Sequence, residues 1–299
     1  MVRLLASAVV LAATLAGAGR TVVAKIAVGP GPCGVTAGFG SVWTVAGGGT
    51  ALVRIDPASN RVRRTITIDY GACGVVALGH FLWVDGYSSN VVEQVDPRSG
   101  KVVRRIPVGG SPWDVAAGAG SVWASNNVDG TISRIDPASG KVVETIRTGG
   151  DPANMKYAFG SLWVGTNNEQ WFARIDPATG KVTRISTHML GPASFTPTGT
   201  AMFVSNRYAG TVSRVNPATN AVVATIRVGV RPVVGAAAAD GRVWIPNSGG
   251  DTLSVIDPAT NRVAATTRVG RGPLIMTTFR GDLWVTMSGT GQLWRISPR

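Results

Sequence analysis

The chain has 299 residues, of which 44% are hydrophobic and 15% are charged, and it carries a formal net charge of +13 at pH 7. The basic residues are spread along the chain without a clustered basic stripe, which argues against a nucleic-acid partner. Weak attraction to anionic envelope polymers is compatible with this charge.

The first 18 residues have the pattern of a secretory signal. Arg3 gives a short basic start, and Leu4 to Leu15 form an apolar run that is too short to span a bilayer. Ala16-Gly17-Ala18 has the small residues of a cleavage site. We expect cleavage after Ala18, no transmembrane segment in the mature chain, and a secreted or periplasmic, cell-envelope protein. The alternative is an uncleaved, lipid-facing anchor.

The rest of the chain repeats one pattern seven times. Two markers share a period of 40 residues, with a single step of 41. One marker is an aliphatic residue, a small polar residue and proline, at Ile55-Asp56-Pro57, Val95-Asp96-Pro97, Ile135-Asp136-Pro137, Ile175-Asp176-Pro177, Val215-Asn216-Pro217, Ile256-Asp257-Pro258 and Ile296-Ser297-Pro298. The other is an aromatic residue, at Trp43, Trp83, Trp123, Trp163, Phe203, Trp244 and Trp284. A fixed period of this length predicts stacked or circular repeats.

Each repeat has the pattern of four short strands. In the third copy they are expected at residues 113–117, 121–125, 131–135 and 142–146, joined by tight turns. Asp136 and Pro137 specify the turn between the third and fourth strands, and Gly140 tolerates the left-handed conformation that closes it. Such a sheet is not stable alone, so the repeats are expected to pack face to face as a propeller.

The two chain ends predict that the ring closes. The seventh copy stops after its third strand, whereas residues 21–29 match the fourth strand at 221–229. The fold class is therefore all-β: a seven-bladed β-propeller with four antiparallel strands per blade, whose last blade is completed by the N-terminal strand. We expect one domain at 19–299, in which the blades span about 30–69, 70–109, 110–149, 150–189, 190–229, 230–270, and 271–299 with 19–29.

Five arginines recur with the same period, each two residues before the polar residue of the Asp-Pro type turn: Arg54, Arg134, Arg174, Arg214 and Arg295. A charge that is spread by periodicity is typical of a solvated or structural face rather than of a binding patch.

Cys33 and Cys73 occupy the same position in adjacent repeats. Equivalent positions around a seven-membered channel are expected to be roughly 6 to 8 Å apart, which straddles the limit of about 7 Å for a disulfide. Export permits oxidation, so a disulfide that joins the first two blades is expected. Free thiols that line the channel are the alternative.

The short motifs Phe203-Val204-Ser205-Asn206, Trp123-Ala124-Ser125-Asn126 and Trp244-Ile245-Pro246-Asn247 resemble the YVTN-type repeat. Over residues 19–299 the chain is similar to the seven-bladed propellers grouped with streptogramin B (virginiamycin B) lyase. The resemblance implies the propeller fold, and it implies an eliminating histidine base with glutamates that hold magnesium. His188 is expected on the ligand-side rim, and His80 on the opposite face. A divergent lactone-opening lyase would use His188, Glu169 and Asp129.

The other hypothesis is a non-catalytic protein that binds a protein, a glycan or a small polar ligand at the ring mouth, without a cofactor or a metal. Polar and aromatic residues gather at first-strand starts and at the loops after second strands. Trp113 is expected to supply an apolar stacking surface and Arg207 to bind an anionic substituent. The expected hydrogen-bonding groups are Asp114, Asn126, Asn167 and Asn206. The alternative is that these asparagines only form turns.

Overall fold

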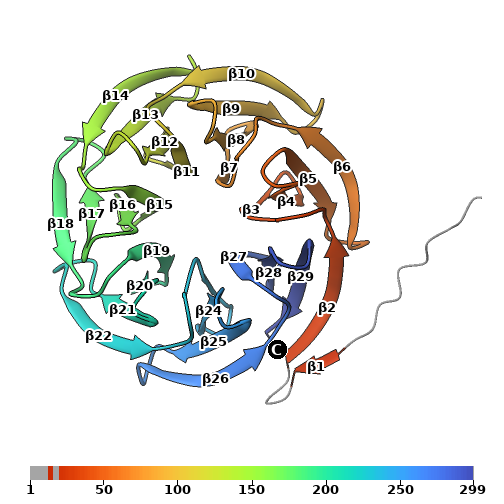
Figure 1. Cartoon of the computed structure of the whole chain (residues 1–299), viewed down its shortest axis with the longest axis vertical. Helices are drawn as coiled ribbons and strands as arrows, with labels where there is room; N and C mark the ends of the chain where they lie inside the picture. Colours follow the sequence, from red (N-terminus) through yellow and green to blue (C-terminus); the bar gives the residue numbers. More distant parts are fainter. Residues whose placement is uncertain (1–12, 16–19, 299) are drawn as a thin grey trace, which may run out of the picture.

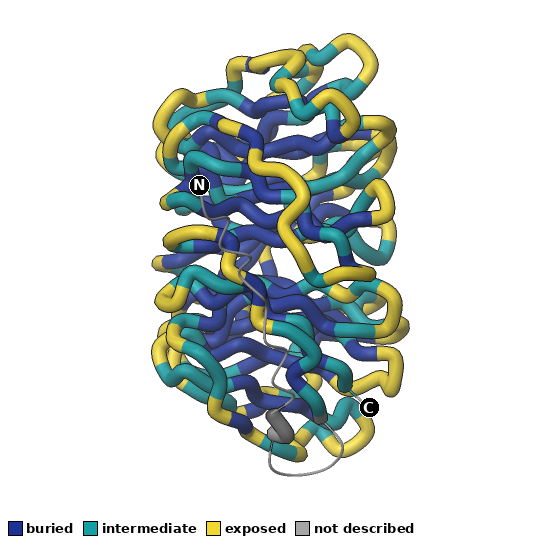
Figure 2. The backbone as a smooth tube through the Cα atoms, turned by 90° about the vertical axis from the view of Figure 1, so that its right-hand side faces the viewer, coloured by how far each residue is buried: buried dark blue, intermediate teal, exposed yellow. Residues whose placement is uncertain are grey.

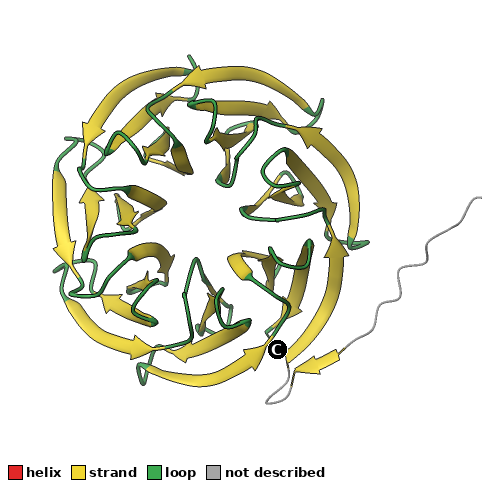
Figure 3. Ribbon diagram, viewed as in Figure 1, coloured by secondary structure: helices red, strands yellow, loops and turns green. Residues whose placement is uncertain are grey.

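The structure, a computed structural model, describes residues 13–15 and 20–298. Seven antiparallel sheets are arranged around a central channel (Figure 1). The described residues form strands, turns and loops (Figure 3), and none of them belongs to a helix that could cross a membrane. The prediction of an all-β, seven-bladed β-propeller is therefore confirmed.

The strands of each blade run in chain order from the channel outward. The first three blades are β3 (Val35–Gly38), β4 (Ser41–Ala46), β5 (Ala51–Asp56) and β6 (Arg61–Thr67); β7 (Val75–Leu78), β8 (Phe81–Gly86), β9 (Val91–Asp96) and β10 (Lys101–Pro107); and β11 (Pro112–Gly118), β12 (Ser121–Asn126), β13 (Thr131–Asp136) and β14 (Lys141–Arg147). The next three are β15 (Pro152–Ala158), β16 (Ser161–Thr166), β17 (Trp171–Ile175) and β18 (Val182–Ser186); β19 (Pro192–Pro197), β20 (Met202–Asn206), β21 (Thr211–Val215) and β22 (Val222–Arg227); and β23 (Ala236–Ala237), β24 (Val243–Asn247), β25 (Thr252–Asp257) and β26 (Arg262–Arg268).

The seventh blade joins the two ends of the chain. Its sheet contains β27 (Pro273–Phe279), β28 (Asp282–Met287), β29 (Gln292–Ser297), β2 (Arg20–Ala27) and the short β1 (Ala13–Leu15). In it, β2 pairs antiparallel with β29, from Thr21 opposite Ser297 to Ala27 opposite Gln292. The predicted closure by the N-terminal strand is confirmed. The strand β1 adds a fifth member to this sheet, from residues that the sequence assigned to the apolar run of the signal.

Burial changes with the distance of a strand from the channel. Every residue of β12, a second strand, is buried, whereas in the outermost β14 only Ile146 is buried. The repeat aromatics lie on the second strands, and Trp43, Trp123 and Trp163 are completely buried. Burial of a large apolar side chain contributes about 1.5–3 kcal/mol, so the second strands carry much of the stability.

The hydrophobic core consists of seven clusters, each of which lies between neighbouring blades. Each of the seven repeat aromatics falls in a different cluster. At the last junction, Trp284 of blade seven packs in one cluster with Val42 of blade one. A blade is therefore stabilised mainly by its neighbours, as expected for a closed array of repeats.

The turns between third and fourth strands form as the sequence predicts. In the third blade, the Asp136 carboxylate accepts a hydrogen bond from the Ala138 N–H at 3.2 Å, and Gly140 adopts φ +68°. Asn60, Asn220 and Asn261 take the same left-handed conformation in other blades, with φ between +55° and +60°.

Four of the five periodic arginines donate hydrogen bonds to the next blade. The Arg295 guanidinium lies over the Trp284 ring at 5.3 Å and donates hydrogen bonds to the Pro57 carbonyl at 2.6 Å and to Asn60 Oδ1 at 3.0 Å. Within the described residues, an arginine of one blade donates to a turn carbonyl of the next blade at six of the seven junctions: Arg64 to Arg98, Arg104 to Ala138, Arg134 to Pro177, Arg174 to Pro217, Arg214 to Pro258, and Arg295 to Pro57. We call these contacts the arginine clamps. Four of the six come from periodic arginines, which gives these four the structural role that was one of the two expected from the sequence. Arg64 and Arg104 lie on fourth strands instead, and Arg54 donates to Ser41 within its own blade.

We predict that removal of residues 19–29 destabilises the whole ring. The deletion removes the buried side chains of Val22, Ile26 and Val28 and leaves β29 paired on one edge only, with β28. Each of these side chains contributes about 1.5–3 kcal/mol, and their sum is comparable with the total stability of many domains. Thermal unfolding followed by circular dichroism would measure the loss, and a chain that lacks only residues 1–12 is the control. An unchanged melting temperature in the longer deletion would contradict the closure.

Candidate functional site

The two flat faces of the ring carry different loops. Loops between second and third strands, and the connections from each fourth strand to the next blade, share one face, which we call the upper face; the Asp-Pro turns lie on the lower face. Figure 2 shows the ring from the side, with exposed loops on both flanks of a buried band. Five of the ten exposed large hydrophobic side chains in the described residues lie in upper-face loops: Tyr70, Val128, Leu190, Tyr208 and Val230. This face therefore offers the larger apolar contact surface.

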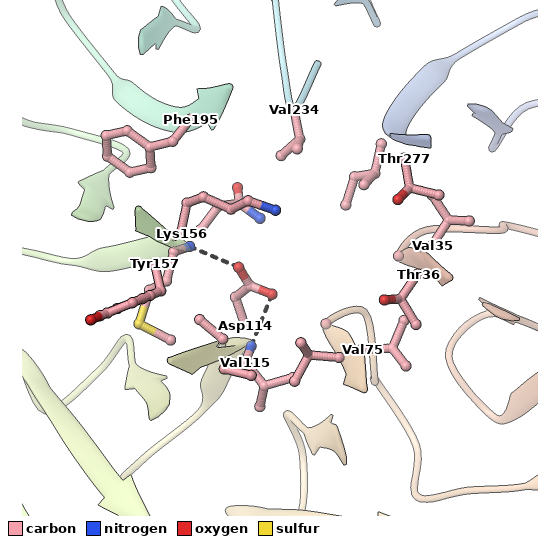
Figure 4. Close-up of a pocket in the computed structure, with 18 of the residues that line it drawn as sticks. Val35, Thr36, Val75, Asp114, Val115, Lys156, Tyr157, Phe195, Val234 and Thr277 are labelled. Atoms are coloured by element: carbon pink, nitrogen blue, oxygen red, sulfur yellow. Dashed lines mark hydrogen bonds between the residues drawn. The ribbon is translucent and has the colours of Figure 1, made fainter. Parts of the chain in front are cut away.

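Trp113 and Asp114 begin the channel-side strand of the third blade. The Trp113 ring is half-buried and meets the Tyr87 ring edge-on, with 5.9 Å between centroids. Asp114 points into the channel (Figure 4), where its carboxylate accepts hydrogen bonds from the Val115 N–H at 2.9 Å and the Met155 N–H at 2.7 Å. Burial raises the pKa of Asp114 to about 6. Asp114 therefore bridges two blades and faces the channel.

Two of the predicted asparagines are buried inside blades. The Asn126 amide donates to Thr131 Oγ1 at 3.0 Å and to Ser133 Oγ at 2.9 Å, and its oxygen accepts from the Gly109 N–H at 3.1 Å. Asn206 makes the matching pair of bonds to Thr211 and Ser213, at 3.0 and 2.9 Å. Both side chains are completely buried, and these bonds use the amide groups to join second and third strands.

Asn167 lies at an upper-face loop and is 9% exposed. Its N–H donates to Asp151 Oδ1 at 3.1 Å, and its Oδ1 is buried with no partner in the described part of the chain. The neighbouring Asn168 side chain also donates to Asp151, at 2.5 Å. Asn167 therefore sits in a small loop network with one unused acceptor.

Arg207 belongs to a group of arginines on the upper face. A surface cavity between the loop after β20 and the connection after β22 is lined by Arg207, Tyr208, Arg227, Val230 and Arg231. The Arg207 guanidinium lies 5.9 Å from the Tyr208 ring centroid, and its Nε is buried without a hydrogen-bond partner in the described residues. We call Arg207, Arg227 and Arg231 the arginine patch. Of the six residues that the sequence proposed as ligand-binding, Arg207 is the one that lines this cavity.

The proposed lyase residues occupy three upper-face loops. His188 is exposed and adopts φ +56° between β18 and β19. Asp129 accepts a hydrogen bond from the Gly110 N–H at 2.7 Å, and Glu169 is half-buried in the loop after β16. In the described residues, no hydrogen bond or ion pair joins any two of the three.

The disulfide joins blades one and two beside the channel. Cys33 and Cys73 are bonded in the structure with Cα atoms 5.2 Å apart, which is closer than the sequence spacing suggested. The Cys73 N–H donates to Asp85 Oδ1 at 2.9 Å. Asp85 is 1% exposed, and burial raises its pKa well above the ordinary range.

The central channel holds a second charged side chain that the sequence analysis did not select. Figure 4 shows Lys156 of β15 pointing into the channel beside Asp114, among Val75, Val115 and Val234. Lys156 stands where the other blades have Thr36, Val76, Ala116, Thr196, Ala236 and Thr277. This departure from the repeat is the signal that could have identified it.

Arg227 and Arg231 were not among the site residues expected from the sequence. Arg231 directly precedes Pro232 in the connection between blades five and six. The equivalent residues before Pro112 and Pro152 are Ser111 and Asp151. A comparison of the copies at this position could have identified it. Its nearness to Arg207 depends on the fold, because the two residues lie in different loops.

We predict that Asn126→Ala destabilises the protein more than the matched Asn206→Ala. Both changes leave two hydroxyl groups without their donor, but only Asn126→Ala also leaves a backbone N–H, that of Gly109, unpaired. An unsatisfied buried group costs about 1–3 kcal/mol, so the difference is expected to be about 1 kcal/mol or more. Urea unfolding would measure both, and equal losses would contradict this role of the Asn126 oxygen.

The chain is similar to known proteins mainly in structure. A family described as a repeat of unknown function, DUF6923, matches residues 63–201. A solved streptogramin B lyase has 16% identity and a TM-score of 0.79, covering 89% of this chain and 93% of its own. The virginiamycin B lyase of Staphylococcus aureus has 14% identity and a TM-score of 0.79, covering 90% and 95%.

The WD40 propeller domain of Doa1 is also similar, with 13% identity, a TM-score of 0.78, and coverage of 95% and 98%. No curated protein matches the sequence significantly. At these identities the likeness concerns the fold, since one propeller scaffold carries unrelated functions. The chain therefore has the seven-bladed propeller fold that is also found in the streptogramin B lyases.

Proposed function

We propose that this protein is an exported, non-catalytic binding propeller that holds an anionic ligand on its upper face. The observation that carries the proposal is the arginine patch, in which Arg207, Arg227 and Arg231 line one cavity together with Tyr208. Guanidinium groups bind carboxylate, sulfate or phosphate through paired hydrogen bonds. Tyr208 and Val230 add exposed apolar surface beside them.

The arginines of the patch have free hydrogen-bonding capacity. Within the described residues, no ion pair involves Arg207, Arg227 or Arg231. Arg268 and Arg271 continue the positive charge onto the next connection, between blades six and seven. The only acid in the upper loops of blades five to seven is Asp251, which accepts a hydrogen bond from the Gly272 N–H at 2.9 Å.

The opposite side of the upper face has acids instead. Asp129, Asp151 and Glu169 lie in loops of blades three and four, and Asp69 lies in the connection from blade one to blade two. Asp129 and Asp151 accept bonds from backbone N–H groups, and Asp69 pairs with Arg105 at 3.2 Å. Because three of these acids have internal partners while the arginine patch has none, an incoming anion is favoured over an incoming cation.

Two further observations support the rest of the proposal. The disulfide between Cys33 and Cys73 is typical of proteins in oxidising compartments, which agrees with export. A lyase or hydrolase needs a base and an acid within reach of one substrate, and hydrogen bonds or ion pairs usually orient these groups. In the described residues, no such contact joins any two of His188, Glu169 and Asp129.

We predict that the protein is retained on immobilised heparin, a sulfated polysaccharide, and that Arg207→Ala with Arg231→Ala weakens retention at least about tenfold. Each charge-assisted hydrogen bond contributes about 1.5–3 kcal/mol, and tenfold in affinity corresponds to about 1.4 kcal/mol. The matched control is Arg61→Ala with Arg262→Ala, which removes the same charge from exposed arginines at the lower edges of outer strands. Affinity measured at low and high salt would report the electrostatic part.

Equal losses in the two double variants would mean that net charge alone retains the protein, and no retention by the parent at low salt would contradict the anionic ligand. If the protein turned over a streptogramin B and His188→Ala abolished that turnover, the lyase alternative would replace the binding proposal.

A further inference from the structure

The junction between blades one and two leaves one periodic arginine without a partner in the next blade. Arg54 lies over the Trp43 ring at 5.6 Å, and its Nε donates to Ser41 Oγ at 2.9 Å. Its two terminal nitrogens, Nη1 and Nη2, make no hydrogen bond or ion pair in the described part of the chain. The guanidinium is therefore held by its own blade, while two of its nitrogens remain available to a ligand.

The lower turn of blade two explains why Arg54 forms no clamp. Arg64, from the fourth strand β6, donates to the Arg98 carbonyl at 2.9 Å and holds this turn instead. Arg64 also fills the space beside Gly100, where an added Cβ atom would lie 2.5 Å from Arg64 Nη1. At three other junctions this turn position is an asparagine that accepts a bond from a periodic arginine: Asn60, Asn220 and Asn261. Arg54 lacks that acceptor because Arg64 occupies its place.

Arg54 borders a cavity on the lower face, between blades one and two. The cavity has a volume of about 280 Å³ and is lined by Phe39, Arg54, His80, Pro97 and Arg98. The side chains of His80 and Arg98 are exposed, and neither makes a hydrogen bond or an ion pair within the described residues. Three side chains with nitrogen donors therefore border one opening, together with two apolar residues and no acid.

The acids of the two neighbouring lower turns have partners of their own. The Asp96 carboxylate accepts hydrogen bonds from the Ser99 hydroxyl at 2.7 Å and from the Arg98 N–H at 2.8 Å, and these bonds lower the pKa of Asp96. Asp56 pairs with Arg63 at 2.7 Å. Neither acid forms an ion pair with a side chain of the cavity, so the positive charge of the lining is not neutralised from within the protein.

Two of the lining residues depart from the repeat. His80 stands where five other blades have glycine, at Gly40, Gly120, Gly160, Gly241 and Gly281. Phe39 is 39% exposed and adopts φ +53°, a conformation that large side chains rarely take. The next two blades have Gly79 and Ala119 at this position. The tight turn therefore requires neither the imidazole nor the aromatic ring that the cavity receives here.

From these observations we propose that the lower-face cavity binds a small oxyanion that carries an apolar group. The two free nitrogens of Arg54 match a pair of oxygens on a phosphate, sulfate or carboxylate. His80 and Arg98 donate to the remaining oxygens, and Phe39 with Pro97 packs against the apolar group. Because the Arg54 guanidinium is already held in place, little side-chain entropy is lost on binding.

This site lies on the opposite face of the ring from the arginine patch, and the inference does not depend on the proposed function. The test is calorimetric titration with phenyl phosphate at low ionic strength, in the parent and in the full-length protein that carries Arg207→Ala and Arg231→Ala. Binding at the lower-face cavity persists in this double variant, because the two changed residues belong to the upper face.

In that background, Arg54→Gln should weaken binding of phenyl phosphate at least about tenfold, since it removes charge-assisted hydrogen bonds. The matched control is Arg262→Gln, which removes the same charge from an exposed arginine of β26 in blade six and should leave the affinity unchanged. Because Arg54 also contacts Trp43 and Ser41, a second variant protects the test from a loss of folding. His80→Gln with Arg98→Gln should weaken binding without changing the melting temperature.

The apolar part of the ligand is tested with Phe39→Gly, which suits the left-handed backbone at this position. This change should weaken binding of phenyl phosphate and leave binding of inorganic phosphate unchanged. An equal effect on the two probes would overturn the role of Phe39.

Three results would overturn the site itself. The first is no binding of phenyl phosphate at low ionic strength in the double variant. The second is an unchanged affinity in folded Arg54→Gln and in His80→Gln with Arg98→Gln. The third is an equal loss in Arg262→Gln, which would show that net charge alone attracts the anion.

Discussion

The structure depends on contacts between blades, and the arginine clamps are the most specific of them. In four of the six clamps, an arginine beside a buried aromatic ring donates to a carbonyl in the lower turn of the following blade, as Arg295 does to Pro57 across the last junction. One guanidinium thus combines a cation–π contact, worth about 0.5–2 kcal/mol, with charge-assisted hydrogen bonds. Apolar packing supplies most of the energy of each junction, but it is not directional. The clamps add direction, because they fix how the lower turn of one blade sits on the next.

The clamps lie on the lower face of the ring. Other specific bonds between blades lie toward the upper face, such as those from Ser205 to the Val233 carbonyl and from Thr286 to the Cys33 carbonyl. Asn126 and Asn206 hold the upper ends of second strands from inside the blades. A buried group without a hydrogen-bond partner in the described residues is found on the upper face, at Arg207 Nε beside Tyr208.

Periodicity made the fold predictable from the sequence, whereas the site depends on exceptions to that periodicity. Strand number, the Asx turns and closure by β2 all follow from residues that recur at a fixed step. The same recurrence misled the choice of ligand groups. Asn126 and Asn206 recur because their amides bond inside the blade, which a sequence pattern does not distinguish from a loop that offers amides to a ligand. Lys156 breaks the pattern of its strand, and its position beside Asp114 depends on the channel, which exists only when seven blades close.

The most direct test of the clamps compares two arginines that share one repeat position. Arg174 lies over Trp163 at 5.0 Å, donates to Ser161 within its own blade and also reaches Pro217 and Asn220 of the next blade. Arg54 lies over Trp43 at 5.6 Å and donates to Ser41 within its own blade. Denaturant unfolding of Arg174→Ala and Arg54→Ala would separate the contact between blades from the ring and serine contacts that both share. The clamp predicts that Arg174→Ala loses at least about 1.5 kcal/mol more than Arg54→Ala. Equal losses would show that stacking and packing alone hold the ring together.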